Sequence, residues 1–175
     1  MKPTVLTLAA ALTLAACATA PQPMGAPTSE VRPPVGAASQ ANWDAGNAAY
    51  LTWNAGRPGW TTTESGLQYR RISAAHAEGR QPVATNTVRV HYRGTFIDGR
   101  EFDGSWARGE PAEFPLNRVI KGWTKGVALM REGERFEFVI PAGLGYGERS
   151  VGGGEIPPNS TLLFTVELLA VLPPA

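Results

Sequence analysis

The sequence has one cysteine, two histidines and three lysines among its 175 residues. A single cysteine cannot form an intrachain disulfide, and two histidines without a cysteine partner argue against a zinc site or a histidine-based triad. The 16 basic residues are balanced by 15 acidic ones, so the chain lacks the excess positive charge with which proteins bind nucleic acid. We therefore expect no metal, no cofactor and no nucleic-acid partner. With 43% hydrophobic residues, the chain can instead bury the core of one globular domain.

The first 17 residues have the pattern of a bacterial signal sequence. Lys2 is followed by a mainly apolar run from Val5 to Ala16. This run of twelve residues is too short to span a bilayer, which needs about 20, but it suits the centre of a signal peptide. The segment LAAC, which ends at Cys17, resembles the lipobox of bacterial lipoproteins. The resemblance predicts a signal peptide over residues 1–16 and acylation of Cys17, which would attach the protein to a membrane. An ordinary secretory signal is the alternative.

Two further features bear on where the protein would lie. Ala18 follows the cysteine, where an aspartate would resemble an inner-membrane retention signal, so the resemblance implies an outer-membrane lipoprotein on the periplasmic side. Residues 17–41 are rich in proline, alanine, serine and glutamine and show no hydrophobic periodicity. This composition is typical of a semi-extended tether.

Residues 42–60 are expected to form a short helical extension. Asn42 is a suitable N-cap, and Gly56 is expected to end the helix. An aromatic stripe at helical spacing more often packs on a core or forms a docking surface than binds a ligand. The members of the stripe are Trp43, Tyr50 and Trp53.

Three stretches farther along the chain have apolar or aromatic residues at almost every second position. They lie at 88–96, 136–140 and 162–169, and a period of two with β-branched and aromatic residues is typical of half-buried antiparallel strands. Asp98 and Gly99 are expected to form the turn after the first strand.

One short helix is predicted between these strands. Trp123, Val127 and Met130 recur at helical spacing, and Gly133 is expected to end the helix. The predicted fold class is therefore α+β, with a curved antiparallel β-sheet wrapped around one short α-helix and preceded by the tether and the short N-terminal helix.

Four short phrases in the second half of the chain carry aromatic and apolar residues in a distinctive order. They are VRVHYRGTFIDGREFDGS from Val88, VIKGW from Val119, GLGYG from Gly143 and EIPPNSTLLFTVELL from Glu155. In order, spacing and residue type they resemble the FKBP-type peptidyl-prolyl isomerases, and the resemblance covers residues 61–175, the expected isomerase domain. With the lipobox-like segment, the chain is similar to the bacterial lipoprotein form of the macrophage infectivity potentiator-like subfamily.

The resemblance implies an active site in an aromatic-walled pocket. Trp123 would form the floor beneath the proline ring of the substrate, and the amide of Ile120 and the phenol of Tyr146 would contact substrate carbonyls. Asp103 is the one charged member expected. The residues to which the resemblance assigns the catalytic pocket are Tyr92, Phe102, Asp103, Val119, Ile120, Trp123, Tyr146, Ile156 and Phe164.

Two positions at the expected substrate rim depart from the pattern of the family. Ala112 stands where the best-known small members have a pocket phenylalanine, and Phe114 is the nearby aromatic residue. Glu155 places a charge where many relatives have an apolar residue. We expect a wider rim from the first departure, and an altered substrate preference or macrolide affinity from the second.

The activity that the resemblance implies is rotation about X–Pro bonds in partly unfolded periplasmic polypeptides, which would assist their folding. Tacrolimus and rapamycin would be inhibitors. No bond is made or broken in this rotation, so the reaction needs no nucleophile, metal or general base. The alternatives are a non-enzymatic proline-binding chaperone or envelope interaction module on the same fold, and an envelope-structural lipoprotein with a vestigial isomerase domain.

Overall fold

The computed structural model describes residues 39–174, so the expected signal peptide, Cys17 and most of the tether lie outside the described residues. In chain order the elements are α1 (Gln40–Ala55), β1 (Thr61–Thr62), β2 (Gln68–Arg71), β3 (Thr87–Thr95), β4 (Glu101–Gly104), β5 (Ala112–Pro115), the 3-10 helix η1 (Leu116–Arg118), α2 (Lys121–Val127), β6 (Arg135–Ile140), the 3-10 helices η2 (Ala142–Leu144) and η3 (Gly152–Gly154), and β7 (Leu162–Leu172).

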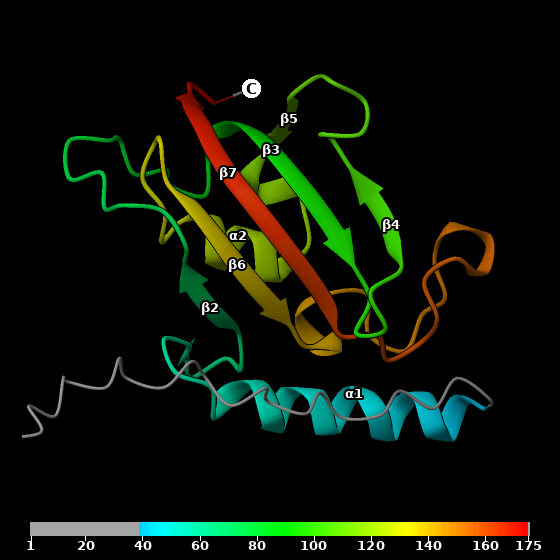
Figure 1. Cartoon of the computed structure of the whole chain (residues 1–175). Coiled ribbons are helices and arrows are strands. Elements are labelled where there is room, and N and C mark those ends of the chain that lie inside the picture. The colour runs from blue at the N-terminus through cyan, green and yellow to red at the C-terminus, as the bar shows by residue number, and fades with distance from the viewer. Residues whose placement is uncertain (1–38, 175) are drawn as a thin grey trace, which may run out of the picture. The chain divides into compact units, whose positions relative to one another are not determined.

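The strands form one seven-stranded antiparallel sheet (Figure 1). Its order is β1-β2-β6-β7-β3-β4, and β5 pairs with β3 beside β4. The alternation predicted for the first long strand is confirmed, because Val88, Val90 and Tyr92 of β3 are buried and Arg89 and Arg93 are exposed. Antiparallel strands with this pattern turn one face to a core.

Helix α2 lies against the buried face of the sheet, as predicted for a sheet wrapped around one short helix (Figure 1). Two glycines allow the close approach. A Cβ atom on Gly126 would lie 2.7 Å from the ring of Phe138, and one on Gly122 would overlap the side chain of Ile140. Larger residues at these positions would push α2 away from the sheet.

The predicted end of α2 is wrong. The helix ends at Val127, and Met130 is fully buried but lies in the turn that follows. Its helical spacing therefore reflects burial rather than helical backbone. Gly133 lies beyond the helix and adopts a φ of +87°, a conformation that favours glycine, in the turn that leads into β6.

Helix α1 packs along the end of the sheet at which β7 begins (Figure 1). The indole Nε1 of Trp43 donates to Ser160 Oγ at 3.2 Å, and the backbone N–H of Thr161 donates to Asn47 Oδ1 at 2.7 Å. Trp43 and Tyr50 are buried, so these members of the aromatic stripe belong to the core, as predicted.

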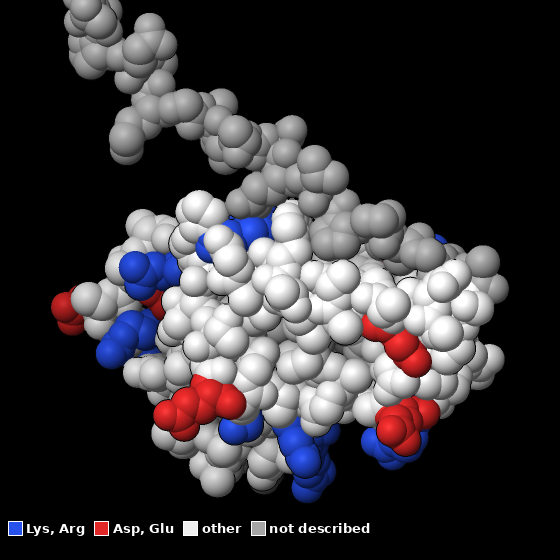
Figure 2. Space-filling model, turned by 90° about the horizontal axis from the view of Figure 1, so that it is seen from below, with Lys and Arg blue, Asp and Glu red and all other residues white. Residues whose placement is uncertain are grey.

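The start of α1 also corrects the prediction. The helix begins at Gln40, and Ser39 rather than Asn42 is its N-cap, because Ser39 Oγ accepts the N–H of Asn42 at 3.2 Å. Gly56 is the C-cap, as predicted. Seen from the α1 side, charged side chains are sparse and lie mostly toward the margins of the described surface (Figure 2). Within residues 39–174, no helix is long and apolar enough to cross a membrane.

Candidate active site

A mostly apolar pocket of about 310 Å³ opens between α2 and the sheet. Strands β3, β4, β5 and β7 supply one side of the wall, and the segment from η1 into α2 supplies the other. The loop after β6 contributes one tyrosine. The lining residues are Tyr92, Phe102, Asp103, Phe114, Arg118, Val119, Ile120, Trp123, Tyr146 and Phe164.

The indole of Trp123 is held by three aromatic rings. Its ring centroid lies 5.3 Å from that of Tyr92, 5.5 Å from that of Phe114 and 5.4 Å from that of Phe164. All three contacts are edge-to-face, with interplanar angles of 84–87°, which is a favourable arrangement for aromatic pairs. Because Trp123 is only 5% exposed and is packed on several sides, it forms a rigid surface within the pocket.

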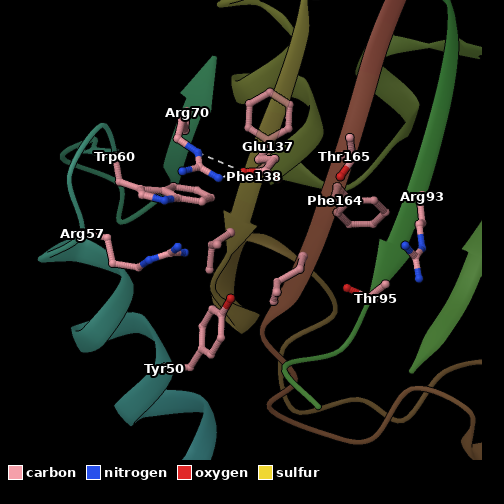
Figure 3. Close-up of a pocket in the computed structure, with 12 residues that line it drawn as sticks. Tyr50, Arg57, Trp60, Arg70, Arg93, Thr95, Glu137, Phe138, Phe164 and Thr165 are labelled. Carbon is pink, nitrogen blue, oxygen red and sulfur yellow. Dashed lines mark hydrogen bonds and ion pairs between the residues drawn. The ribbon is translucent and has the colours of Figure 1, made fainter. Parts of the chain in front are cut away.

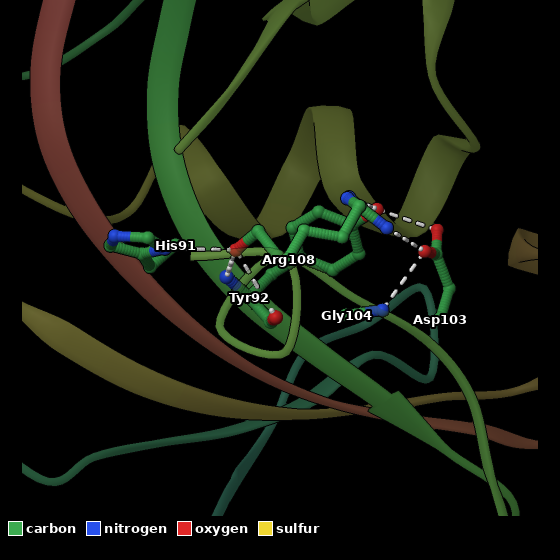
Figure 4. A network of polar contacts seen from close by, with 6 residues as sticks. His91, Tyr92, Asp103, Gly104 and Arg108 are labelled. Atoms are coloured by element: carbon green, nitrogen blue, oxygen red, sulfur yellow. Dashed lines mark hydrogen bonds and ion pairs between the residues drawn. The ribbon is translucent and has the colours of Figure 1, made fainter. Parts of the chain in front are cut away.

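Asp103 forms the polar edge of this pocket (Figure 4). The hydroxyl of Tyr92 donates to its Oδ2 at 2.5 Å, while the N–H of Gly104 and Nη1 of Arg108 each donate to its Oδ1 at 2.9 Å. Arg108 Nη2 also donates to the hydroxyl oxygen of Tyr92 at 3.1 Å. The carboxylate is therefore bonded through both of its oxygens, and one of those bonds fixes the Tyr92 ring.

These contacts set the charges at the pocket edge. Partial burial alone would raise the pKa of Asp103, but the hydrogen bonds from Tyr92 and Arg108 outweigh it and lower the pKa below its ordinary value. Burial, and then the bond to Asp103, raise the pKa of Tyr92. At neutral pH the site therefore holds an ionised carboxylate and a neutral phenol.

A serine behind the pocket anchors the loop that carries Arg108. The fully buried Ser105 accepts the N–H of Tyr92 on its Oγ at 2.7 Å, and Nδ1 of His91 lies 3.0 Å from the same oxygen. The backbone N–H of Arg108 in turn donates to the carbonyl of Ser105 at 3.2 Å. The hydroxyl of Ser105 thus ties the Arg108 loop to β3.

Some hydrogen-bond donors at the pocket have no partner among the described residues. Among them are the backbone N–H of Ile120 and the hydroxyl of Tyr146. Burial, and then the charge of Asp103, raise the pKa of Tyr146, so its hydroxyl keeps its proton at neutral pH. Donors left free in an apolar pocket are suited to bind carbonyl oxygens of a ligand.

The structure brings together eight of the nine residues predicted for the catalytic pocket, together with Phe114 of the predicted rim. Three predicted residues do not line it. Ile156 is buried beside its bridge partner Val151, Glu155 is exposed, and Ala112 pairs with Val90 and packs against the core.

Sequence reasoning missed two arginines at this site. Arg118 lines the pocket directly, so Asp103 is not its only charged member. Arg108 holds Asp103 from a loop. The FDGSWAR segment offered a signal, since it places a guanidinium five residues after the carboxylate, but only the loop geometry brings the two together.

A second cavity, also about 310 Å³, lies on the opposite face of the sheet and differs in character (Figure 3). Arg70 lies over the ring of Trp60, with 5.1 Å from its Cζ to the ring centroid, and donates to Glu137 through both Nε and Nη2. Charged side chains make up part of the lining of this cavity, and Arg70 and Glu137 pair with each other there, so it is less suited to an apolar ring than the first pocket.

Residues 78–169, more than half of the chain, match the family described as FKBP-type peptidyl-prolyl cis-trans isomerase. The chain belongs to this family. The matched FKBP segment contains all of the residues that line the apolar pocket. The match confirms the family that the sequence motifs indicated.

Similar proteins support the same assignment. FkpA of Aeromonas hydrophila, named an FKBP-type peptidyl-prolyl cis-trans isomerase, is 54% identical over 114 residues, which cover 65% of this chain and 41% of that protein. The outer membrane protein MIP of Legionella longbeachae is 48% identical over 107 residues, covering 61% and 45%. The crystal structure of FkpA from Escherichia coli has a TM-score of 0.71 at 45% identity, covering 76% of this chain and 61% of that one. The chain thus spans less than two thirds of each of these FKBP relatives.

Proposed function

We propose that the protein is a peptidyl-prolyl cis-trans isomerase and that the apolar pocket is its active site. The observation that carries the proposal is that the closely packed indole of Trp123 lines the same pocket as two donors, Ile120 N–H and the Tyr146 hydroxyl, that have no partner among the described residues. A flat apolar floor fits the ring of proline, and the donors fit the carbonyl groups on either side of it.

The reaction makes a defined energetic demand on this pocket. The barrier to rotation is about 18–20 kcal/mol, and the uncatalysed event takes tens of seconds. An acceleration of about 10⁴-fold requires about 5.5 kcal/mol of preference for the transition state. The planar amide carries partial charges on oxygen and nitrogen, which fade as the bond twists. An apolar site therefore disfavours the planar ground state relative to the twisted transition state.

The polar residues would orient the substrate within that apolar space. The donors at Ile120 and Tyr146 would hold the chain on both sides of the proline in a turn, which reduces the entropy still to be lost in the transition state. Asp103 would keep the Tyr92 ring fixed against Trp123, and Arg108 would keep the carboxylate in place. No proton transfer or covalent step is needed.

The setting of the enzyme is part of the proposal. Residues 61–175 would be the isomerase domain and residues 42–60 its helical extension. The signal peptide over residues 1–16, the lipid on Cys17 and outer-membrane attachment stay predictions from sequence. The Legionella relative is named outer membrane protein MIP, which supports a location in the cell envelope. Clients would be partly folded proline-containing polypeptides, and tacrolimus and rapamycin would compete for the pocket.

An isomerisation assay tests this function. The purified full-length protein should accelerate the cis-to-trans conversion of a Leu-Pro peptide, and tacrolimus or rapamycin should abolish the acceleration. Asp103→Ala and Trp123→Ala should reduce it, with circular dichroism confirming that each variant is folded. Macrolide binding without any acceleration would favour the non-enzymatic proline-binding module instead.

A further inference from the structure

A basic depression of about 470 Å³ lies directly beside the apolar pocket. The two share part of their walls, because Arg118, Val119, Ile120 and Tyr146 line both. The depression continues from there along the start of α2 and the glycine-rich loop after β6. Its lining residues are Arg118, Val119, Ile120, Lys121, Gly143, Gly145, Tyr146, Gly147 and Arg149.

The basic residues of this depression differ from most others in residues 39–174. Eight arginines elsewhere in this part of the chain form ion pairs with a carboxylate. In contrast, Arg118, Lys121 and Arg149 are exposed and form no ion pair within the described residues. Of these three side chains, only that of Arg149 makes a hydrogen bond to another described residue, a long one of 3.5 Å from its Nε to the carbonyl of Tyr146.

Acidic side chains do not line the depression. Glu148 precedes Arg149 in the loop and is exposed, and Glu155 lies farther along the same loop, but neither is a lining residue or an ion-pair partner of the three cations. Asp103, in the neighbouring pocket, is already bonded to Arg108. Three positively charged residues therefore line one hollow, and no acidic residue is among its lining residues in the described part of the chain.

We infer that this depression is a specificity subsite for an acidic side chain of the same polypeptide whose proline occupies the apolar pocket. The inference rests on the proposed isomerase function. Charge complementarity selects the occupant, and the shared wall at Ile120 and Tyr146 puts it within a few residues of the proline. The subsite makes the enzyme prefer proline segments flanked by glutamate or aspartate.

The expected size of the preference for an acidic peptide follows from the solvent exposure of the three basic side chains. Ion pairs between exposed groups are individually weak, but three cations around one hollow act together, and we expect an advantage of about three- to tenfold in kcat/KM at low ionic strength. Because the Debye length falls from about 30 Å at 0.01 M salt to about 8 Å at 0.15 M, the advantage should shrink as salt is added.

The test uses the full-length protein and peptides centred on Leu-Pro. A glutamate replaces a glutamine at one position at a time, from three residues before the proline to three after it, and kcat/KM is compared within each glutamate–glutamine pair. The double variant Lys121→Gln/Arg149→Gln removes two cations that do not line the apolar pocket. Lys125→Gln is the matched control, since Lys125 is an exposed residue of α2 that forms no ion pair within residues 39–174 and does not line the depression.

The inference predicts a glutamate preference at one or two positions, which is lost in the double variant and kept in Lys125→Gln. A glutamate-to-glutamine ratio of kcat/KM near one at every position would overturn the inference. So would a glutamate preference that the double variant retains. Fluorescence anisotropy with the same labelled peptides reads the preference out as affinity. If no peptide is isomerised, the proposed function fails, while the affinity ratios still decide whether the acidic subsite exists.

Discussion

The hydroxyl of Tyr92 and the carboxylate of Asp103 form a 2.5 Å hydrogen bond at the edge of the apolar pocket. The bond joins neighbouring strands, because Tyr92 lies on β3 and Asp103 on β4. The same Tyr92 ring packs edge-to-face on Trp123. The bond therefore couples the polar edge of the site to its aromatic floor.

A double-mutant cycle should reveal this coupling. Tyr92→Phe removes this hydrogen bond and Asp103→Asn weakens it by removing the charge of the acceptor, so their effects on kcat/KM should be non-additive, with an interaction energy of about 1–2 kcal/mol. Isomerisation assays on the two single variants and the double variant provide the measurement. Additive effects would mean that the two groups act independently.

The pH dependence of activity should follow the charges of the site. The pKa of Asp103 is lowered and those of Tyr92 and Tyr146 are raised, so none of these groups should titrate between about pH 5 and pH 9. We expect kcat/KM to be flat in that range and to fall in more acidic solution, as Asp103 becomes protonated. An inflection near neutral pH would show that another group controls the rate.

The stability of the fold should depend on the same carboxylate. Because the folded pKa of Asp103 lies below its unfolded value, its contribution is present above about pH 4 and is lost as the pH falls through the folded pKa. Asp103→Asn should therefore lower the urea midpoint at pH 7, and the difference from the unmodified protein should shrink below pH 4. A difference that stays constant with pH would argue that Asp103 stabilises the fold without its charge.

The attachment of α1 can be tested through Asn47. Its Oδ1 accepts the buried N–H of Thr161, so Asn47→Ala leaves that donor unsatisfied at a cost of about 1–3 kcal/mol. The melting temperature should drop by about 3–8 °C, with little effect on kcat/KM because α1 does not line the pocket. Asn42→Ala is the matched control, because Asn42 is an exposed residue of the same helix. Equal melting temperatures for the two variants would refute this role.

Gly94 allows two pocket rings to pack against β3. A Cβ atom there would lie 2.7 Å from Phe102 and 2.8 Å from Phe164, so Gly94→Ala should displace these rings and destabilise the fold by about 1–3 kcal/mol. The displaced rings should also weaken macrolide binding, measured by calorimetry. The control Gly56→Ala adds a methyl group at ordinary contact distance. Unchanged macrolide affinity in folded Gly94→Ala would contradict the assigned geometry.

The strands and most of the pocket could be predicted from the sequence because both depend on local or family-wide patterns. A period of two in β3 reports which side chains are buried, and the order of the motifs locates the aromatic residues. Spacing alone does not separate burial from backbone conformation, so it predicts a helix as far as Met130, which lies in the turn after α2. Ser39 was missed as a cap because the polar residues around it carry no periodic signal.

The remaining differences concern contacts made through loops. Arg108 reaches Asp103 only because the chain turns back after β4, and Ser105 anchors that turn from the buried side. Glu155 and Ile156 were expected beside the pocket, but they follow η3 in a loop whose path is not encoded by spacing. Arg118 lines the pocket as part of η1, a position that no sequence pattern indicated.

The central claim is that the pocket around Trp123 accelerates rotation about X–Pro bonds. NMR exchange spectroscopy on a short Leu-Pro peptide, with catalytic amounts of the full-length protein, measures that rotation directly at equilibrium. We predict faster cis–trans exchange with unchanged cis and trans populations. In a folded Trp123→Leu variant the acceleration should fall by about 100-fold, which corresponds to about 2.7 kcal/mol of transition-state stabilisation. Exchange no faster than in buffer, or equally fast with Trp123→Leu, would contradict the claim.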